Sequence, residues 1–184
     1  MNARGADGDL VGRLRDGDVA ALGEVYDAHH ERVRAFARRL LGDDAAAEDL
    51  VQETFLALPD AIRRYRGDAP LRTFVIGVAA NHGRHHTRSA VRRRAAHERS
   101  AEAVRPSPPS PEDETRRKQL AAALTRALDA LPFDQRVAIV LCDVEERTSA
   151  EAAAIVGVPE ATIRTRIFHG KKKLRDALEK EGLR

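Results

Sequence analysis

Apolar residues recur at helical spacing through most of the chain, and no segment shows the alternation of a half-buried strand. The clearest pattern covers residues 19–41, where Leu22, Val25, Val33, Phe36 and Leu40 line one face of an amphipathic helix. A shorter apolar group at 10–14 predicts a small helix before it. The Asp-Gly-Asp sequence at 16–18 separates the two. The pattern therefore predicts an all-α fold.

Two more helices are predicted in the first half of the chain. The apolar stripe of 44–58 contains Leu50, Val51, Phe55 and Leu58, and we expect Pro59 to end that helix. Residues 60–69 form a predicted loop or short turn. Pro70 then suits the opening of a fourth helix, whose apolar face runs from 71 to 79.

The composition changes between 101 and 114, where RPSPPSPEDE carries four prolines in a short polar run. Such a segment is typical of an extended, semi-rigid linker. A new helix is expected from about 112, and Leu131-Pro132 should break it before a helix at 135–142 that Asp134 caps. The prediction is two small helical units, 8–98 and 112–182, joined by a linker at 99–111.

The strongest local motif lies at 148–175. Thr148 and Glu151 have the spacing of a capping box, Gly157 can end that helix, and Pro159 suits the first turn of the next one. The second helix is basic on its outward face. This pattern predicts a DNA-binding helix-turn-helix. The alternative is a pair of packed helices with a solvated basic face.

Charge is segregated along the chain, although the net charge of its 184 residues is only +3. Between Arg39 and Arg63 there is no lysine or arginine, and six acidic residues lie there. Phosphates would repel such a helix. It is either a solvated face or a docking surface for a basic protein partner.

The opposite sign dominates residues 81–99, which carry six arginines and four histidines against one acid. Together with Tyr65 in the basic loop before that helix, this segment has what single-stranded nucleic acid requires, which is phosphate neutralisation and a ring for stacking. The helical spacing of His82, His85 and His86 is also one that a metal-binding site can have. That site is not predicted, because no carboxylate or cysteine accompanies the histidines along the helix and two arginines flank them.

Composition narrows the function further. Cys142 is the only cysteine and tryptophan is absent, so neither an intramolecular disulfide nor a thiolate cage for a metal is expected. The start of the chain has no apolar signal core and no run is long enough to span a bilayer, so we expect a cytoplasmic protein. No nucleophile–base constellation or phosphate loop indicates an enzyme, and no cofactor is predicted.

Three segments in order resemble bacterial RNA polymerase sigma factors of the sigma-70 family. AEDLVQETFLAL (47–58) is similar to the core-binding region 2.2, YRGDAPLRTFVIGVAAN (65–81) to regions 2.3 and 2.4, and residues 131–167 to region 4. The short linker in place of a middle domain resembles the extracytoplasmic-function (ECF) group. The resemblance implies a promoter-specificity subunit that is not an enzyme and that melts DNA with binding energy.

The resemblance also assigns roles to residues. It implies that the acidic helix contacts the clamp helices of the polymerase β′ subunit, with region 4 at the β flap. The residues implied for the clamp are Asp49, Gln52, Glu53, Phe55 and Leu56. Those implied for the minus-ten element are Arg63, Arg64, Tyr65, Asn81, Arg84, His85 and Arg88. Those implied for the minus-35 element are Thr162, Arg164, Thr165, Arg166, Phe168, His169, Lys171 and Lys173.

Some expectations stay open. The family implies an anti-sigma partner without identifying it, and the promoter sequences do not carry over. Gly170 stands inside the basic helix, where glycine costs about 1 kcal/mol relative to alanine. The alternative function is a stand-alone helix-turn-helix regulator, which would not need the acidic helix or the arginine-rich fourth helix.

Overall fold

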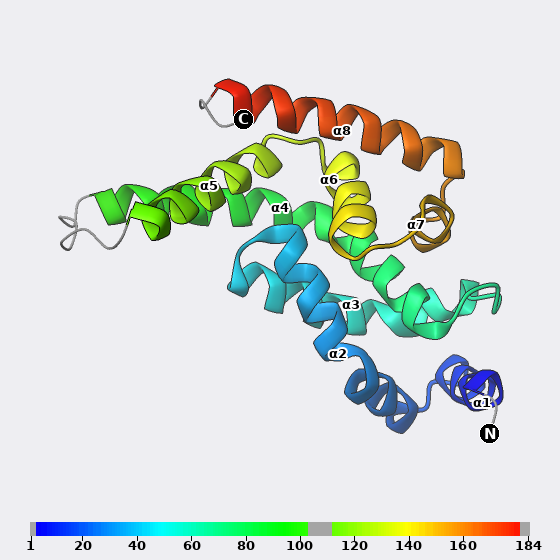
Figure 1. Cartoon of the computed structure of the whole chain (residues 1–184). Coiled ribbons are helices and arrows are strands. Elements are labelled where there is room, and N and C mark those ends of the chain that lie inside the picture. Colours follow the sequence, from blue (N-terminus) through cyan, green and yellow to red (C-terminus); the bar gives the residue numbers. More distant parts are fainter. Residues whose placement is uncertain (1–2, 103–111, 181–184) are drawn as a thin grey trace.

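The computed structural model describes residues 3–102 and 112–180, and every regular element within those ranges is helical (Figure 1). This confirms the predicted all-α class. In chain order the elements are α1 (Ala3–Arg15), α2 (Val19–Leu41), α3 (Asp44–Ala61), the 3₁₀ turn η1 (Ile62–Arg64), α4 (Leu71–Glu102), α5 (Glu112–Asp129), α6 (Phe133–Ile139), the π-helical turn η2 (Val140–Val144), α7 (Ser149–Val156) and α8 (Glu160–Lys180).

The first half of the molecule is built on α2, α3 and α4, whose apolar stripes face one another. Val33, Leu50 and Leu58 are completely buried there. Local signals set the helix ends. The Asp18 carboxylate accepts a hydrogen bond from the Ala20 N–H at 2.8 Å, and Gly42 ends α2 in the left-handed conformation at φ 61°. The predicted bounds of this helix are confirmed.

The predicted helix-turn-helix is formed by α7 and α8. The capping box is present, since Thr148 Oγ1 accepts from the Glu151 N–H while the Glu151 carboxylate accepts from the Thr148 N–H. Gly157 has φ 69°, which lets the chain turn between the helices. Gly170 is buried where α8 crosses α6, and a Cβ there would lie 2.6 Å from Ile139 Cδ1. Close packing explains this glycine.

Three predicted helix boundaries were wrong. Pro59 lies inside α3, which continues to Ala61 and tightens into η1, because the following Ile62 is fully buried in the core. Pro132, not Asp134, is the N-cap of α6, and the Pro132 carbonyl accepts from the Gln135 and Arg136 N–H groups. The helix α4 runs to Glu102, past the predicted start of the linker at 99. Residues 103–111, the rest of that linker, lie outside the described residues.

The two predicted units pack against each other and share one core. Val137, Leu141 and Ile155 from the second half belong to the same apolar cluster as the buried residues of α2, α3 and α4. The closest approach is at Gly77 of α4, where a Cβ would lie 2.2 Å from the Ile155 carbonyl oxygen. The sequence did not reveal this contact, in which α2 and α4 cover apolar residues of α6 and α7.

Candidate nucleic-acid interface and docking helix

The outward face of α3 carries an open row of side chains, Asp49, Gln52 and Leu56, at successive helical turns. All three are exposed, and Leu56 is 79% exposed. No described side chain forms an ion pair with Asp49. Phe55 differs from them, because it is 5% exposed and packs edge-on against Tyr26 at 4.9 Å. Of the predicted docking residues, Phe55 belongs to the core beneath the face.

Glu53 lies on the side of α3 that faces α4. His82 Nδ1 is 2.9 Å from one oxygen of its carboxylate, and His86 Nε2 hydrogen-bonds to the other. Partial burial by itself would raise the pKa of Glu53, but the hydrogen bonds from His86 and His82 outweigh it and lower the pKa. The sequence interpretation assigned Glu53 to the docking face and missed its hydrogen bonds with the histidines, because they come from a neighbouring helix.

Three other acids at this helix, Asp43, Asp44 and Glu48, are paired with arginines of neighbouring elements. Arg34 Nε donates to Glu48 at 2.9 Å, and this hydrogen bond lowers the pKa of Glu48 despite some desolvation. Arg93 Nε donates to the N-capping Asp43 at 3.0 Å. These pairs occupy acids at the start and edge of α3, whereas Asp49 on the outward row has no cation beside it among the described side chains.

The loop between η1 and α4 presents an aromatic pair. The Tyr65 ring lies 5.0 Å from the Phe74 ring, and its hydroxyl donates to the Ala69 carbonyl at 2.5 Å. Arg63 and Arg64, the last two residues of η1, are both exposed. The ring is thus held in a fixed orientation beside exposed cations.

The first basic turns of α4 expose Asn81, Arg84 and His85 on one side. Arg84 lies over the Phe133 ring, 5.0 Å from its centroid, and donates to the Asp134 carboxylate at 2.7 Å. The side chain of Arg88 lies outside the described residues. The structure therefore places three of the four predicted α4 residues together, with Arg84 in contact with the second half of the chain.

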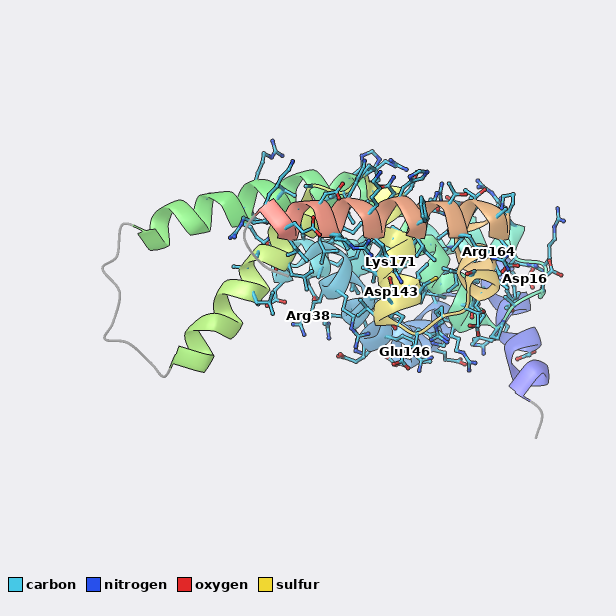
Figure 2. The ribbon with its side chains drawn as sticks, turned by 45° about the horizontal axis from the view of Figure 1, so that its top comes forward. Asp16, Arg38, Asp143, Glu146, Arg164 and Lys171 are labelled. Atoms are coloured by element: carbon cyan, nitrogen blue, oxygen red, sulfur yellow. The ribbon has the colours of Figure 1, made fainter. Side chains whose placement is uncertain are left out.

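The helix α8 presents Arg164, Thr165, Phe168 and His169 outward, and Phe168 is 67% exposed. Figure 2 shows Arg164 on this helix. Arg164 donates to Glu160 one turn earlier at 2.6 Å. The exposed face continues through Lys173, whereas Thr162 is half-buried. Most of the predicted minus-35 residues therefore share one face.

Two cations of α8 are already paired with carboxylates from other elements. Arg166 Nη2 lies 3.4 Å from the second oxygen of Asp134, and Lys171 Nζ lies 2.7 Å from Asp143, as Figure 2 shows for the lysine. Sequence reasoning missed Asp134 as a bridging residue, because it expected a helix cap there. Pro132 takes the capping position, and this leaves the carboxylate free for arginines.

A buried arginine network joins the two halves. Arg94 and Arg136 both contact Asp129, and Arg136 is only 1% exposed. Burial lowers the pKa of Arg136, and the nearby Asp129 carboxylate offsets part of this lowering. Within the described residues, Nε and Nη2 of Arg136 are buried without a hydrogen-bond partner. No motif or spacing in the sequence indicated this cluster.

The described residues contain neither a histidine, cysteine and carboxylate group arranged to hold a metal ion nor a helix with the length and apolar character needed to cross a membrane. The arrangement can bind through charge and aromatic stacking, with a negative helix on one face and basic helices elsewhere.

Family models and individual relatives indicate the same protein family. Residues 25–93 match the model for Sigma-70 region 2, and residues 121–174 match the model for Sigma-70, region 4. The chain is 32% identical over 166 residues to RNA polymerase sigma factor CarQ of Myxococcus xanthus, covering 90% of this chain and 94% of CarQ. It is 35% identical over 170 residues to ECF RNA polymerase sigma factor SigE of Mycolicibacterium smegmatis, covering 89% of this chain and 65% of SigE.

Solved structures resemble the whole chain. CnrH in complex with the cytosolic domain of CnrY is 25% identical with a TM-score of 0.58, covering 95% of this chain and 97% of CnrH. The sigma factor RpoE of Bartonella quintana, in complex with the anti-sigma factor NepR, is 24% identical with a TM-score of 0.54 and covers 88% of this chain and 98% of that one. The second likeness supports the fold alone.

Proposed function

The chain belongs to the sigma-70 family of RNA polymerase sigma factors, in its ECF group, and we propose that it binds core polymerase and directs promoter-specific initiation. The observation that carries this proposal is the separation of charge by helix. The outward row of α3 is open and carries the carboxylate of Asp49 with no lysine or arginine along the helix, whereas the loop at 63–65, the middle of α4 and the outer face of α8 are basic. One face thus suits a protein and the others suit nucleic acid.

In this proposal α3 docks on the β′ clamp helices through Asp49, Gln52 and Leu56. An exposed leucine flanked by a carboxylate and an amide has the make-up of an interface anchor, in which apolar burial supplies affinity and charge supplies orientation. Glu53 and Phe55 support the face from beneath. The half of the chain from α5 to α8, which matches region 4, would lie at the β flap.

The minus-ten element would be opened at the loop and α4. Extruding a base costs a few kcal/mol. Stacking on an aromatic ring returns about 1–3 kcal/mol per base. Tyr65, fixed by Phe74 and by its bond to Ala69, can provide that ring. Asn81 offers both a donor and an acceptor to a base edge, while Arg63, Arg64 and Arg84 can hold phosphates. Binding energy does this work, so the chain need not be an enzyme.

The minus-35 element would be read by α8 in the major groove. Arg164 and Thr165 stand near the start of the helix, where a recognition helix contacts base edges. Lys171 and Lys173 lie further along and fit phosphate contacts, which position the helix without reading sequence. We also propose an anti-sigma partner for this chain. The structure of RpoE, whose fold it shares, contains the anti-sigma factor NepR, and the structure of CnrH contains the cytosolic domain of CnrY.

A capture experiment with core polymerase tests the proposal. Reversing the row with Asp49→Lys should abolish retention on immobilised core enzyme, and Asp27→Lys, an equally exposed reversal on α2, should leave retention unchanged. Run-off transcription from a random promoter library should then yield defined start sites with the wild-type chain and with Asp27→Lys, and none with Asp49→Lys. A stand-alone regulator would ignore core polymerase in every form, and that outcome would overturn the proposal.

A further inference from the structure

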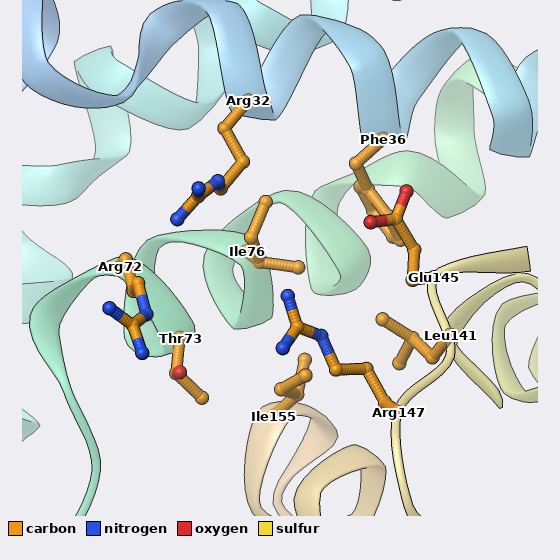
Figure 3. Close-up of a pocket in the computed structure, with 9 residues that line it drawn as sticks. All are labelled: Arg32, Phe36, Arg72, Thr73, Ile76, Leu141, Glu145, Arg147 and Ile155. Carbon is orange, nitrogen blue, oxygen red and sulfur yellow. The ribbon is translucent and has the colours of Figure 1, made fainter.

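Three arginines from different elements line one recess where α2 and α4 meet the segment before α7. Arg32 comes from α2, Arg72 from the first turn of α4 and Arg147 from the connection that leads into α7. Figure 3 shows their guanidinium groups turned toward the same space, beside Thr73 and Ile76. Because the three residues are far apart in the sequence, no local pattern connected them.

These three arginines lack acidic partners. No ion pair joins any of them to a carboxylate within the part of the chain that the structure describes. Among the described residues that line the recess, Glu145 alone is acidic, and it is already paired with Arg39. Arg34 and Arg94, by contrast, each lie against a carboxylate. A recess lined by positive charge attracts anions from solution.

The space for an anion lies at the mouth of this recess. The recess itself has a volume of about 20 Å³, which is room for little more than a water molecule. A wider recess of about 360 Å³ adjoins it, and Arg72, Thr73 and Arg147 line both. The larger volume is at the lower end of the range for small-molecule sites. An anion therefore fits where the two recesses meet.

The donors at this junction suit a phosphoryl group better than a carboxylate. A phosphate monoester carries about two negative charges at neutral pH and has three terminal oxygens. A carboxylate carries one charge on two oxygens. Guanidinium groups bind either anion through paired N–H donors. Two arginines and the Thr73 hydroxyl, with the charge of Arg32 behind them, supply more donors than one carboxylate can use.

The walls of the wider recess indicate what the phosphoryl group is attached to. Small apolar residues line it from the loop before α4 and from α7, together with the carboxylates of Asp68 and Glu151. These carboxylates would repel a second phosphoryl group, whereas they can accept hydrogen bonds from hydroxyl or amino groups. The body of the ligand is therefore uncharged and carries hydrogen-bond donors, as a nucleoside does.

We propose that this junction binds a nucleoside monophosphate. The phosphoryl group lies against Arg72, Thr73 and Arg147, and the nucleoside occupies the wider recess. The inference stands independently of the proposed function, because none of these residues belongs to the faces assigned to polymerase or promoter DNA.

Isothermal titration calorimetry of the full-length chain tests the site with four probes, which are adenosine monophosphate, guanosine monophosphate, inorganic phosphate and adenosine. We expect at least one nucleotide to bind saturably, with one molecule per chain, and more tightly than either inorganic phosphate or adenosine. Equal affinity for inorganic phosphate would overturn the assignment of a nucleoside to the wider recess. Equal affinity for adenosine would overturn the role of the arginines.

Substitutions on opposite walls locate the binding. Arg72→Gln and Arg147→Gln should each weaken nucleotide binding by about tenfold or more, because each removes a charged donor to the phosphoryl group. Using both keeps the test decisive if thermal melting shows that one is misfolded. Arg175→Gln is the matched control, because Arg175 is an exposed arginine of α8 outside the recess. If the folded variants bind as tightly as Arg175→Gln, or wild type binds no probe at millimolar concentration, the proposal is wrong.

Discussion

The helices α3 and α8 are both amphipathic and both carry charged side chains on their outward faces. They differ in whether those side chains form ion pairs with the rest of the chain. On α3 the row of Asp49, Gln52 and Leu56 is open. On α8, Arg166 and Lys171 are paired with carboxylates of the same chain. The surface proposed to bind protein is therefore exposed and unpaired, whereas two cations of the surface proposed to bind DNA already form ion pairs within the chain.

This difference suggests an order of events in the proposed function. A chain whose protein-binding face is open and whose DNA-binding faces are filled meets polymerase first and DNA second. Such an order would keep the free subunit from occupying promoters by itself. Substitutions made on one face at a time test this comparison. The largest change in stability is expected from a substitution in α3.

Two leucines of α3 separate folding from docking. Leu58 is fully buried and Leu56 is 79% exposed. Leu58→Ala should lower the free energy of unfolding by about 2–5 kcal/mol. Leu56→Ala should change it by less than about 0.5 kcal/mol. Urea unfolding measures both.

The same pair should show the reverse ranking at the interface. Leu56→Ala should weaken binding to core polymerase about tenfold, as loss of an interface anchor does. Leu58→Ala should bind normally at temperatures where it remains folded. If Leu56→Ala binds core polymerase as well as wild type, the outward row of α3 is a solvated face and the comparison with α8 loses its meaning.

On α8 the comparison can be sharpened by separating base contacts from phosphate contacts. In the assembled holoenzyme, Arg164→Ala should cost about 1–3 kcal/mol at a preferred promoter and relax the sequence preference at one position. Lys173→Ala should weaken all promoters alike and reduce the salt slope of binding by about 1. Competition binding across promoter variants and a salt titration measure these effects. Equal loss of specificity in both variants would contradict a reading role for Arg164.

The helices and their ends near Asp18, Gly42 and Thr148 were predictable, because each depends on residues within one turn. The same holds for the faces of α3 and α8, since helical spacing alone decides which residues share a side. The resemblance of ordered segments to one family was also readable from the sequence. All of these are local signals or sums of local signals.

What could not be predicted depends on contacts between distant residues. Glu53 meets His82 and His86, and Asp134 meets Arg84, only after α3 and α6 pack on α4. The packing of the two predicted units against each other was not foreseen, for the same reason. A proline-rich segment marks a break in regular structure, but it does not reveal whether the halves on either side touch. Gly77 and Gly170 become intelligible only once their neighbours are placed.

The smallest expected effect is on the pH dependence of stability. It tests the contact that Glu53 makes between α3 and α4. Burial tends to raise the pKa of Glu53, but hydrogen bonds from His86 and His82 lower it below its ordinary value of 4.5. A carboxyl whose pKa is depressed by folding stabilises the native state above its unfolded value, and this contribution disappears as the pH falls through the folded value. The acid-sensitive window therefore lies below pH 4.5.

Glu53→Gln removes this contribution, so its free energy of unfolding should fall less than that of wild type between about pH 5 and about pH 3.5. The difference should stay below about 1 kcal/mol, because the side chain is 39% exposed and solvent screens the pair. Asp49→Asn, a change of the same charge on the open row, should keep the acid sensitivity of wild type. Urea unfolding at both pH values provides the measurement. If Glu53→Gln and Asp49→Asn lose stability equally, the histidines do not anchor α3 to α4, and both faces of the helix are simply solvated.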